Sequence, residues 1–240
     1  MNSVSDFIQD VIYERKNLAI KYRIPEKPLP GRMMWSDRWE VFSPLLSKDL
    51  TLYGPLECRN WILIESDQNV AGFCPQPLWM TGTYQGVDGK SLVDFYILKT
   101  DGSEEFQEVK KKEDMDNINS DPELRRQIDI QKQWCLKRNV THVIRTEEDI
   151  DVKPFLIENW GTIIHQYSLT RNMDYTSKMA KISAALLLDK EGSIRDVTSE
   201  CGEDSEFVMA HLLHLKLAEL LEENQRMTWS SRVRLTQKWQ

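Results

Sequence analysis

The sequence has few cysteines and no long apolar run. Its four cysteines are scattered and include no Cys-x-x-Cys pair, which favours reduced thiols that mostly serve as small buried apolar residues. No apolar run approaches the length that crosses a bilayer. The N-terminal stretch MNSVSDFIQDVIYERK carries acids and lacks the uninterrupted apolar segment of a signal peptide. These absences predict a cytoplasmic protein that does not engage a membrane.

The sequence also lacks an excess of positive charge. Its formal net charge is −7 and its pI is near 5.3. This charge argues against a protein that coats nucleic acid on its own by bulk electrostatics. It remains compatible with a local basic groove, or with DNA that a partner delivers.

The 240 residues are enough for one large domain or two small ones, and a hydrophobic content of 40% is ordinary for a globular protein. Up to about residue 150 the pattern predicts an α/β sandwich around a mixed sheet. Its expected helices and strands are a helix at 5–22, a proline-rich arm, a helix at 54–66, strand-like runs at 70–84 and 91–109, a helix from Ser120 and a strand at 140–146.

The rest of the chain changes character and predicts a helical domain. A helix at 153–169 is followed by three more helical segments, the last at 204–223, and by the alternating stretch RMTWSSRVRL. This order has the outline of a winged helix-turn-helix. We therefore expect domains at residues 1–152 and 153–240.

Acidic and basic residues occupy unusual positions in the stretch SLVDFYILKTDGSEEFQEVKKK. Asp94 interrupts an apolar run, Asp101-Gly102 predicts a tight turn, and Glu108-Val109-Lys110 ends the next run. Facing strands of such a hairpin hold side chains about 5 Å apart, so Asp94 and Glu108 can meet on one face. Lys110 shares that face because it lies two residues beyond Glu108.

Two carboxylates that close repel each other, and a cation relieves the repulsion. Mg²⁺ takes oxygen ligands, and a nearby ammonium can orient an attacking water or offset phosphate charge. Glu57, on the preceding helix, supplies a third acid in an apolar setting. The pattern therefore suits metal-assisted phosphodiester hydrolysis, although an acid followed by Glu-x-Lys also arises by chance and can serve packing alone.

The stretches GPLECRNWILIESDQNVAGFCPQPLWM and GKSLVDFYILKTDGSEEFQEVK resemble the catalytic domain of the TnsA family, the endonuclease subunits of heteromeric cut-and-paste transposases. The resemblance covers residues 54–150, and it implies the fold of restriction endonucleases, the PD-(D/E)xK nucleases. Residues 153–240 match the second domain of the family in layout only. One departure is Val93, which stands where family members usually have proline before the aspartate.

The resemblance implies a role for each matching residue. Asp94, Glu108 and the Val109 carbonyl would bind Mg²⁺, for which Mn²⁺ can substitute. Glu57 would bind a second ion or its water, and Lys110 would assist the water. Gln76-Pro77, which also matches, is interpreted as a structural bend.

The resemblance also implies partners. The nuclease would cut the 5′ ends of a transposon, while a separate TnsB-like DDE transposase cuts and joins the 3′ ends. A TnsC-like AAA+ ATPase regulator would contact the nuclease, partly through the C-terminal domain of the nuclease. Two alternatives stay open: a stand-alone restriction or junction-resolving nuclease of the same fold, and a non-catalytic adaptor that recruits the ATPase.

Three further features could bind ligands. Lys111 and Lys112 could steer a phosphate backbone or could be a solvated strand end. His211 and His214 have metal-ligand spacing, but a polar helix face is the expected explanation. The tail after Arg226 has only basic charges and includes tryptophans, which suits DNA or an acidic partner surface as well as a wing packed on its own domain. Its basic residues are Arg226, Arg232, Arg234 and Lys238, and its tryptophans are Trp229 and Trp239.

Overall fold

The computed structural model describes residues 4–16, 20–27, 37–189 and 191–236. Its chain contacts divide it into two compact units. The sheet unit contains Ala19–Val41 and Asp49–Val152, and the helical unit contains Met1–Leu18, Phe42–Lys48 and Lys153–Gln240. The expected domain boundary near residue 152 coincides with one of these divisions, whereas the N-terminal helix and residues 42–48 group with the C-terminal helices.

The sheet unit is built on a four-stranded sheet with the order β3-β6-β7-β8. β6 pairs antiparallel with both β3 and β7, and β8 pairs parallel with β7, so the sheet is mixed, as the sequence predicts. The expected hairpin is present, with its turn at Asp101 and Gly102, whose φ is +84°. The strands are β3 (Val70–Pro75), β6 (Phe95–Lys99), β7 (Glu104–Val109) and β8 (Thr141–Arg145).

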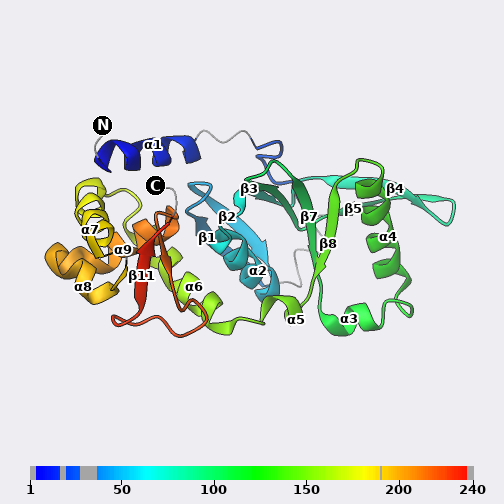
Figure 1. The fold of residues 1–240 in the computed structure, drawn as a ribbon. Coiled ribbons are helices and arrows are strands. Elements are labelled where there is room, and N and C mark those ends of the chain that lie inside the picture. Colours follow the sequence, from blue (N-terminus) through cyan, green and yellow to red (C-terminus); the bar gives the residue numbers. More distant parts are fainter. Residues whose placement is uncertain (1–3, 17–19, 28–36, 190, 237–240) are drawn as a thin grey trace. The chain divides into compact units, whose positions relative to one another are not determined.

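Two helices, α2 (Pro55–Ser66) and α4 (Pro122–Leu136), cover opposite faces of this sheet (Figure 1). Neighbouring residues of a strand point to opposite faces. On β7, Gln107 accepts a hydrogen bond from Asn60 of α2 at 2.8 Å, while Glu108 accepts one from Gln131 of α4 at 2.7 Å. The face that carries Glu108 is therefore the face under α4.

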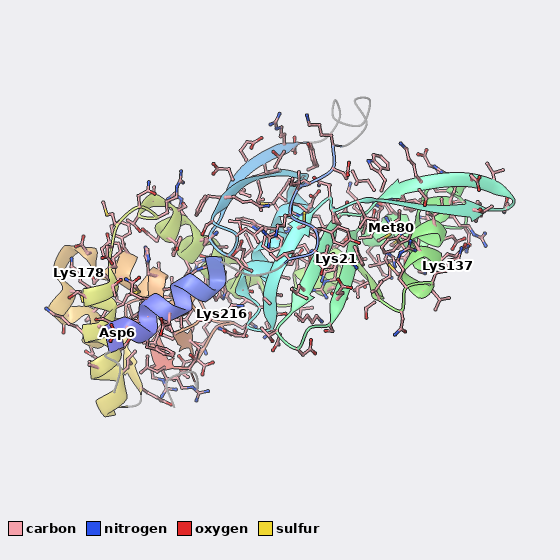
Figure 2. The ribbon with its side chains drawn as sticks, turned by 90° about the horizontal axis from the view of Figure 1, so that it is seen from above. Asp6, Lys21, Met80, Lys137, Lys178 and Lys216 are labelled. Atoms are coloured by element: carbon pink, nitrogen blue, oxygen red, sulfur yellow. The ribbon has the colours of Figure 1, made fainter. Side chains whose placement is uncertain are left out.

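A two-stranded ribbon extends the core beneath α4. β4 (Trp79–Tyr84) and β5 (Val87–Leu92) pair antiparallel, and β4 packs against α4. Met80, labelled in Figure 2, is fully buried in the cluster that includes Phe106 and Trp134. The rest of the unit comprises α3 (Lys112–Asp116), α5 (Glu147–Ile150) and parts of the paired strands β1 (Arg38–Ser43) and β2 (Lys48–Tyr53), which the sequence pattern did not predict.

The start of α4 corrects one detail of the sequence analysis. The N-cap is Asp121, whose side chain accepts hydrogen bonds from the backbone N–H groups of Glu123 and Leu124. The cap expected at Ser120 lies one residue later, because Pro122 occupies the first position of the helix and makes the preceding residue the cap. Ser120 instead donates to the Asn117 carbonyl.

In the helical unit, α1 (Val4–Lys16) packs along α7 (Thr176–Asp189), and the Gln9 amide donates to the Thr176 hydroxyl at 2.8 Å. The helix expected at 5–22 is too long: α1 ends at Lys16, and residues 20–22 are described but not helical. Residues 17–19, and residues 28–36 of the proline-rich arm, lie outside the described residues. The other elements are α6 (Pro154–Leu169), β9 (Glu191–Ser193), α8 (Ile194–Thr198), the 3-10 turn η1 (Ser199–Asp204), α9 (Ser205–His214), β10 (Ala218–Leu220) and β11 (Arg232–Leu235).

The prediction of one long helix at 204–223 is wrong for the second half of that range. α9 ends at His214, Lys216 adopts a left-handed backbone with φ +58°, and residues 218–220 form a strand that pairs with β11. β11 also pairs with β9, so the three strands form an antiparallel sheet beside the helices. Tertiary pairing overrides the helical propensity of this leucine-rich segment.

No helix in the described part of the chain has the length and apolar character needed to cross a membrane.

Candidate functional site

Glu57 is held in the first turn of α2 by two hydrogen bonds. Gly54, with φ +98°, and Pro55 start the helix, which brings Glu57 back under the end of β2. The carboxylate Oε2 accepts from the Tyr53 backbone N–H at 3.1 Å, and Oε1 accepts from Gln76 Nε2 at 2.9 Å. Only 6% of Glu57 is exposed, so its orientation is set by these donors.

Asp94 lies immediately before β6 and is fixed to the end of β7. Its Oδ2 accepts from the Val109 backbone N–H at 2.7 Å, and its carbonyl accepts from the Gln76 backbone N–H, also at 2.7 Å. Asp94 thus joins two strand ends through its side chain and its backbone. The sequence expectation placed it inside a strand, but β5 ends at Leu92 and β6 begins at Phe95.

Glu108 is fully buried near the end of β7 and accepts hydrogen bonds from three side chains. The Lys110 ammonium and Gln127 Nε2 both donate to Oε1, the latter at 2.5 Å, and Gln131 Nε2 donates to Oε2 at 2.7 Å. A buried carboxylate without partners would be costly, and these donors offset that cost.

The acids and the lysine open onto one cleft of about 730 Å³. The predicted residues Glu57, Asp94, Glu108, Val109 and Lys110 all line it, as does Gln76. Burial raises the pKa of Glu57 well above its usual value, and the charges of Asp94 and Glu108 raise it further. The Tyr53 N–H and the Lys110 ammonium act in the opposite direction. The negative charges of Asp94 and Glu108 therefore act on Glu57 across the cleft.

The donor chemistry of this cleft fits Mg²⁺. Its lining includes the carboxylates of Glu57, Asp94 and Glu108 and the Val109 backbone, and hard divalent cations prefer oxygen ligands. The raised pKa of Glu57 reflects a concentration of negative charge that a cation would relieve. Within the described residues, however, no three His, Cys, Asp or Glu side chains are gathered closely enough to enclose an ion.

The structure adds three amide side chains that the sequence analysis did not assign to the site. Gln76 has φ +41°, a costly backbone for a non-glycine residue, and its amide supports Glu57. Gln127 and Gln131 support Glu108 from α4. Gln131 carried a signal that could have been used, because it is a polar residue on the apolar stripe of its helix.

The two lysines after the site differ in their surroundings. Lys111 is exposed and lines the cleft. Lys112 lies in α3, where its ammonium pairs with Asp116 at 2.7 Å and approaches Glu148 at 3.9 Å. Of the two, Lys111 is therefore the better placed to meet a phosphate in the cleft.

The basic residues of the tail are engaged within the helical unit. Arg232 pairs with Glu222 at 2.9 Å and Glu191 at 3.4 Å, and Arg234 pairs with Glu219 at 2.5 Å. Arg226 likewise pairs with Glu158 at 3.0 Å. Lys238 and Trp239 lie outside the described residues. These pairs favour the interpretation of the tail as a wing packed on its own domain.

His211 and His214 do not form the polar helix face that was expected, because both are buried. The ring of Tyr167 lies 4.3 Å from that of His211 and 4.9 Å from that of His214, and Thr170 Oγ1 is 3.1 Å from His211 Nε2. Burial, followed by the neighbouring His214, lowers the pKa of His211 to about 4. His211 is therefore neutral near pH 7, and the rings of both histidines pack in the core.

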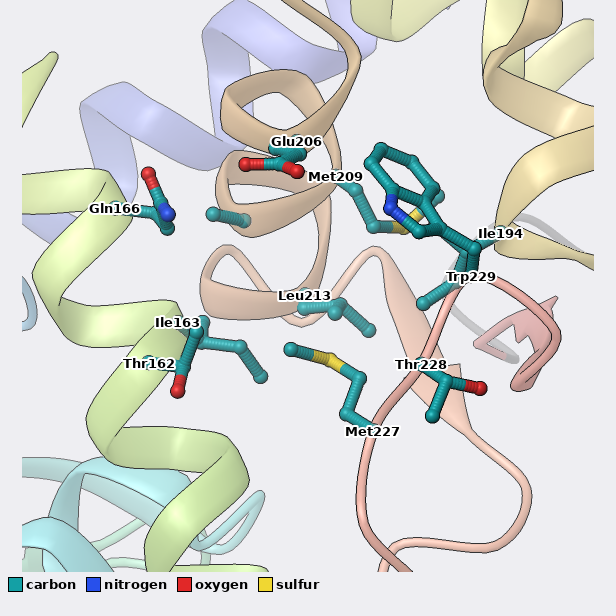
Figure 3. Close-up of a pocket in the computed structure, with 11 residues that line it drawn as sticks. Thr162, Ile163, Gln166, Ile194, Glu206, Met209, Leu213, Met227, Thr228 and Trp229 are labelled. Carbon is teal, nitrogen blue, oxygen red and sulfur yellow. The ribbon is translucent and has the colours of Figure 1, made fainter.

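A second pocket, of about 320 Å³, lies in the helical unit. Figure 3 shows apolar side chains from α6, α9 and the chain before β11 around it, with Glu206 and Gln166 on the α6 and α9 side. Its apolar lining includes Ile163, Met209, Leu213, Met227 and Trp229. Trp229, one of the two tryptophans of the tail, is 38% exposed and lines this pocket.

A scan against protein-family models finds no match to this chain, and a search of curated proteins finds none either.

Proposed function

We propose that this protein is a Mg²⁺-dependent DNA endonuclease that hydrolyses phosphodiester bonds. The observation that supports the proposal is the shared cleft: Glu57, Asp94, Glu108 and Lys110, chosen from sequence alone, all line it. Packing alone gives no reason to gather Glu57, Asp94 and Glu108 at one opening, because each carboxylate adds repulsion that the fold must offset.

Each residue has a distinct part in the proposed reaction. Asp94, Glu108 and the Val109 carbonyl would hold Mg²⁺, with Glu57 holding a second ion or its water. Bound Mg²⁺ would supply a Lewis acid and a more acidic water. Lys110 would orient the attacking water or offset charge on the phosphate, and Lys111 would attract the DNA backbone.

The wider assignment is a TnsA-like subunit that cuts the 5′ ends of a transposon. The mixed sheet between α2 and α4, with acids at the strand ends, supports a restriction-endonuclease-like fold for the sheet unit. In the helical unit, helices beside a three-stranded antiparallel sheet support a winged-helix domain. Its proposed partners are transposon-end DNA, a TnsB-like DDE transposase and a TnsC-like AAA+ ATPase.

The decisive experiment is nicking of transposon-end DNA by the reconstituted complex with Asp94→Ala. The variant should lose Mg²⁺-dependent cleavage and keep its fold, because the substitution also relieves carboxylate repulsion. Asp114→Ala, which removes an exposed acid at the same cleft, is the matched control and should cleave normally. Full activity of Asp94→Ala would refute the assignment.

Binding of DNA by the purified chain separates this proposal from a stand-alone nuclease. With a net charge of −7, the isolated protein should bind short duplexes weakly at physiological salt, and its affinity should fall as salt rises. Tight, sequence-specific binding would favour the stand-alone enzyme. Absence of cleavage by the complete complex, with the ATPase still recruited, would favour the adaptor.

A further inference from the structure

The α4 helix contributes two glutamines to the carboxylate of Glu108. Gln127 and Gln131 are four residues apart and therefore lie on the same face of the helix. Gln127 donates to Oε1 and Gln131 donates to Oε2, so each oxygen of the carboxylate receives an amide N–H.

The hydrogen bonds of Gln131 determine which end of its side-chain amide is the nitrogen and which is the oxygen. The Lys110 ammonium can only donate, which marks Glu108 as the acceptor at this site. Gln131 Nε2 faces Glu108 Oε2 at 2.7 Å and Ser91 Oγ at 2.9 Å, and these two bonds use both of its N–H groups. Gln131 Oε1 is then left as an acceptor.

His142 completes this chain of hydrogen bonds from β8. Its Nε2 lies 2.9 Å from Gln131 Oε1. Because that oxygen can only accept, His142 Nε2 carries the hydrogen, and the imidazole donates to the amide. The series of hydrogen bonds therefore runs from the His142 N–H through the Gln131 amide to Glu108, and in each bond the donor points toward the carboxylate.

Burying Gln131 at this position costs free energy that packing alone does not explain. Its side chain is fully buried on a helix face that otherwise contributes Ile130, Trp134 and Cys135 to the core. A buried amide is tolerated only when its hydrogen bonds are made, and an apolar residue of similar volume would avoid that demand. Groups of this kind commonly orient the carboxylates that hold metals.

We propose that Gln131 and His142 are positioning residues that orient the Glu108 carboxylate for divalent-cation binding. Gln131 acts on Glu108 directly, and His142 acts through Gln131. The inference rests on the proposed function, because it takes Glu108 to be a metal ligand.

The test is titration of the full-length protein with Mn²⁺ alone, with free Mn²⁺ followed by electron paramagnetic resonance. Gln131→Leu should weaken Mn²⁺ binding about 10–100-fold. His142→Phe should weaken it less, because it removes only the donor to Gln131, and His142→Gln should restore affinity by supplying another N–H. Gln133→Leu changes an exposed glutamine of the same helix and should bind as the wild type does.

Thermal melting without metal checks that each variant is folded. If Gln131→Leu fails to fold, His142→Phe and its rescue by His142→Gln carry the test. Wild-type affinity in a folded Gln131→Leu, or in His142→Phe where only that variant folds, would overturn this inference and leave the proposed nuclease intact. Failure of the wild type itself to bind Mn²⁺ would overturn both.

Discussion

Each unit of this protein buries a cluster of ionisable side chains, and the two clusters differ in their hydrogen-bond partners and in their access to solvent. In the sheet unit, Glu57 and Glu108 are nearly or fully buried but open onto a cleft and accept hydrogen bonds from N–H donors. In the helical unit, His211 and His214 are equally buried and lie among aromatic rings.

The difference shows that burial alone does not identify a functional site. Burial disfavours the charged form in both clusters, so it raises the pKa of Glu57 and lowers that of His211. Only the carboxylates have a lysine, several amide donors and an opening at which a ligand can enter. The two histidine rings are buried and pack against aromatic rings as part of the core.

The largest expected effect is a loss of cleavage activity, which would distinguish a catalytic cleft from a cluster of acids without a catalytic role. Lys110→Met removes the ammonium that bonds Glu108 and faces the cleft. If Lys110 assists the attacking water, cleavage should fall at least about 100-fold in the nicking assay of the reconstituted complex. Lys112→Met, which removes a lysine paired outside the cleft, should leave most of the activity, and equal losses in both variants would contradict the assignment.

The next effect concerns the histidine cluster at low pH. Because the pKa of His211 is lowered to about 4, its contribution to stability is fully present above pH 6.5 and is lost as the pH falls toward 4. The loss should approach about 3 kcal/mol. The free energy of unfolding, measured with denaturant at a series of pH values, should fall in this way in the wild type and in His165→Gln, a control at an exposed histidine. It should fall less steeply in His211→Phe. Identical slopes in all three proteins would refute it.

The acid cluster should show the opposite slope. Because the pKa of Glu57 is raised, the folded state binds this proton more tightly than the unfolded state does. Its contribution is therefore most favourable below the ordinary glutamate pKa and declines as the pH rises through the folded value. Without divalent cation at neutral pH, Glu57→Gln should raise the melting temperature by about 2–4 °C, the shift expected for about 1 kcal/mol. A lower melting temperature would mean that the charge of Glu57 stabilises the fold.

The smallest effect concerns the paired arginines of the wing. Arg234→Glu places two acids opposite each other on β10 and β11, since Arg234 faces Glu219. The exposed pair should change the melting temperature only slightly, and adding Glu219→Arg should reverse that change. If the tail is only a wing, DNA and ATPase binding should be unchanged in the swapped protein. Loss of either interaction would identify the tail as a binding surface.

Local signals in the sequence predicted much of the sheet unit. Pro55 and Pro122 mark the starts of α2 and α4, and Asp101-Gly102 marks the turn of the β6–β7 hairpin. Because the pairing of the strands follows from that short turn, Asp94 and Glu108 could be expected to meet. The four cysteines are free, as expected, and three of them are buried.

Other features had no local signal. The pattern of residues 215–220 predicts helix. The backbone of Lys216 is instead left-handed, and β10 pairs with β11 beyond the reach of local contacts, with Ala218 opposite Leu235. The histidines were expected on a polar face because their spacing says nothing about Tyr167, which lies on another helix. The pairing of Arg232 with both Glu222 and Glu191 likewise joins segments that are distant in the sequence.

The sequence by itself determined the acids, the lysine and the hairpin, because these depend on residue chemistry and on contacts between neighbours in the chain. Only the tertiary structure decided what surrounds them. Gln76 follows β3 and bonds Glu57 of α2, whereas Gln131 of α4 bonds Glu108 of β7 and His142 of β8. These hydrogen bonds exist because the two helices pack against the sheet. A side chain's partners across such distances depend on the packed fold, since the same glutamine exposed to water would bond to the solvent instead.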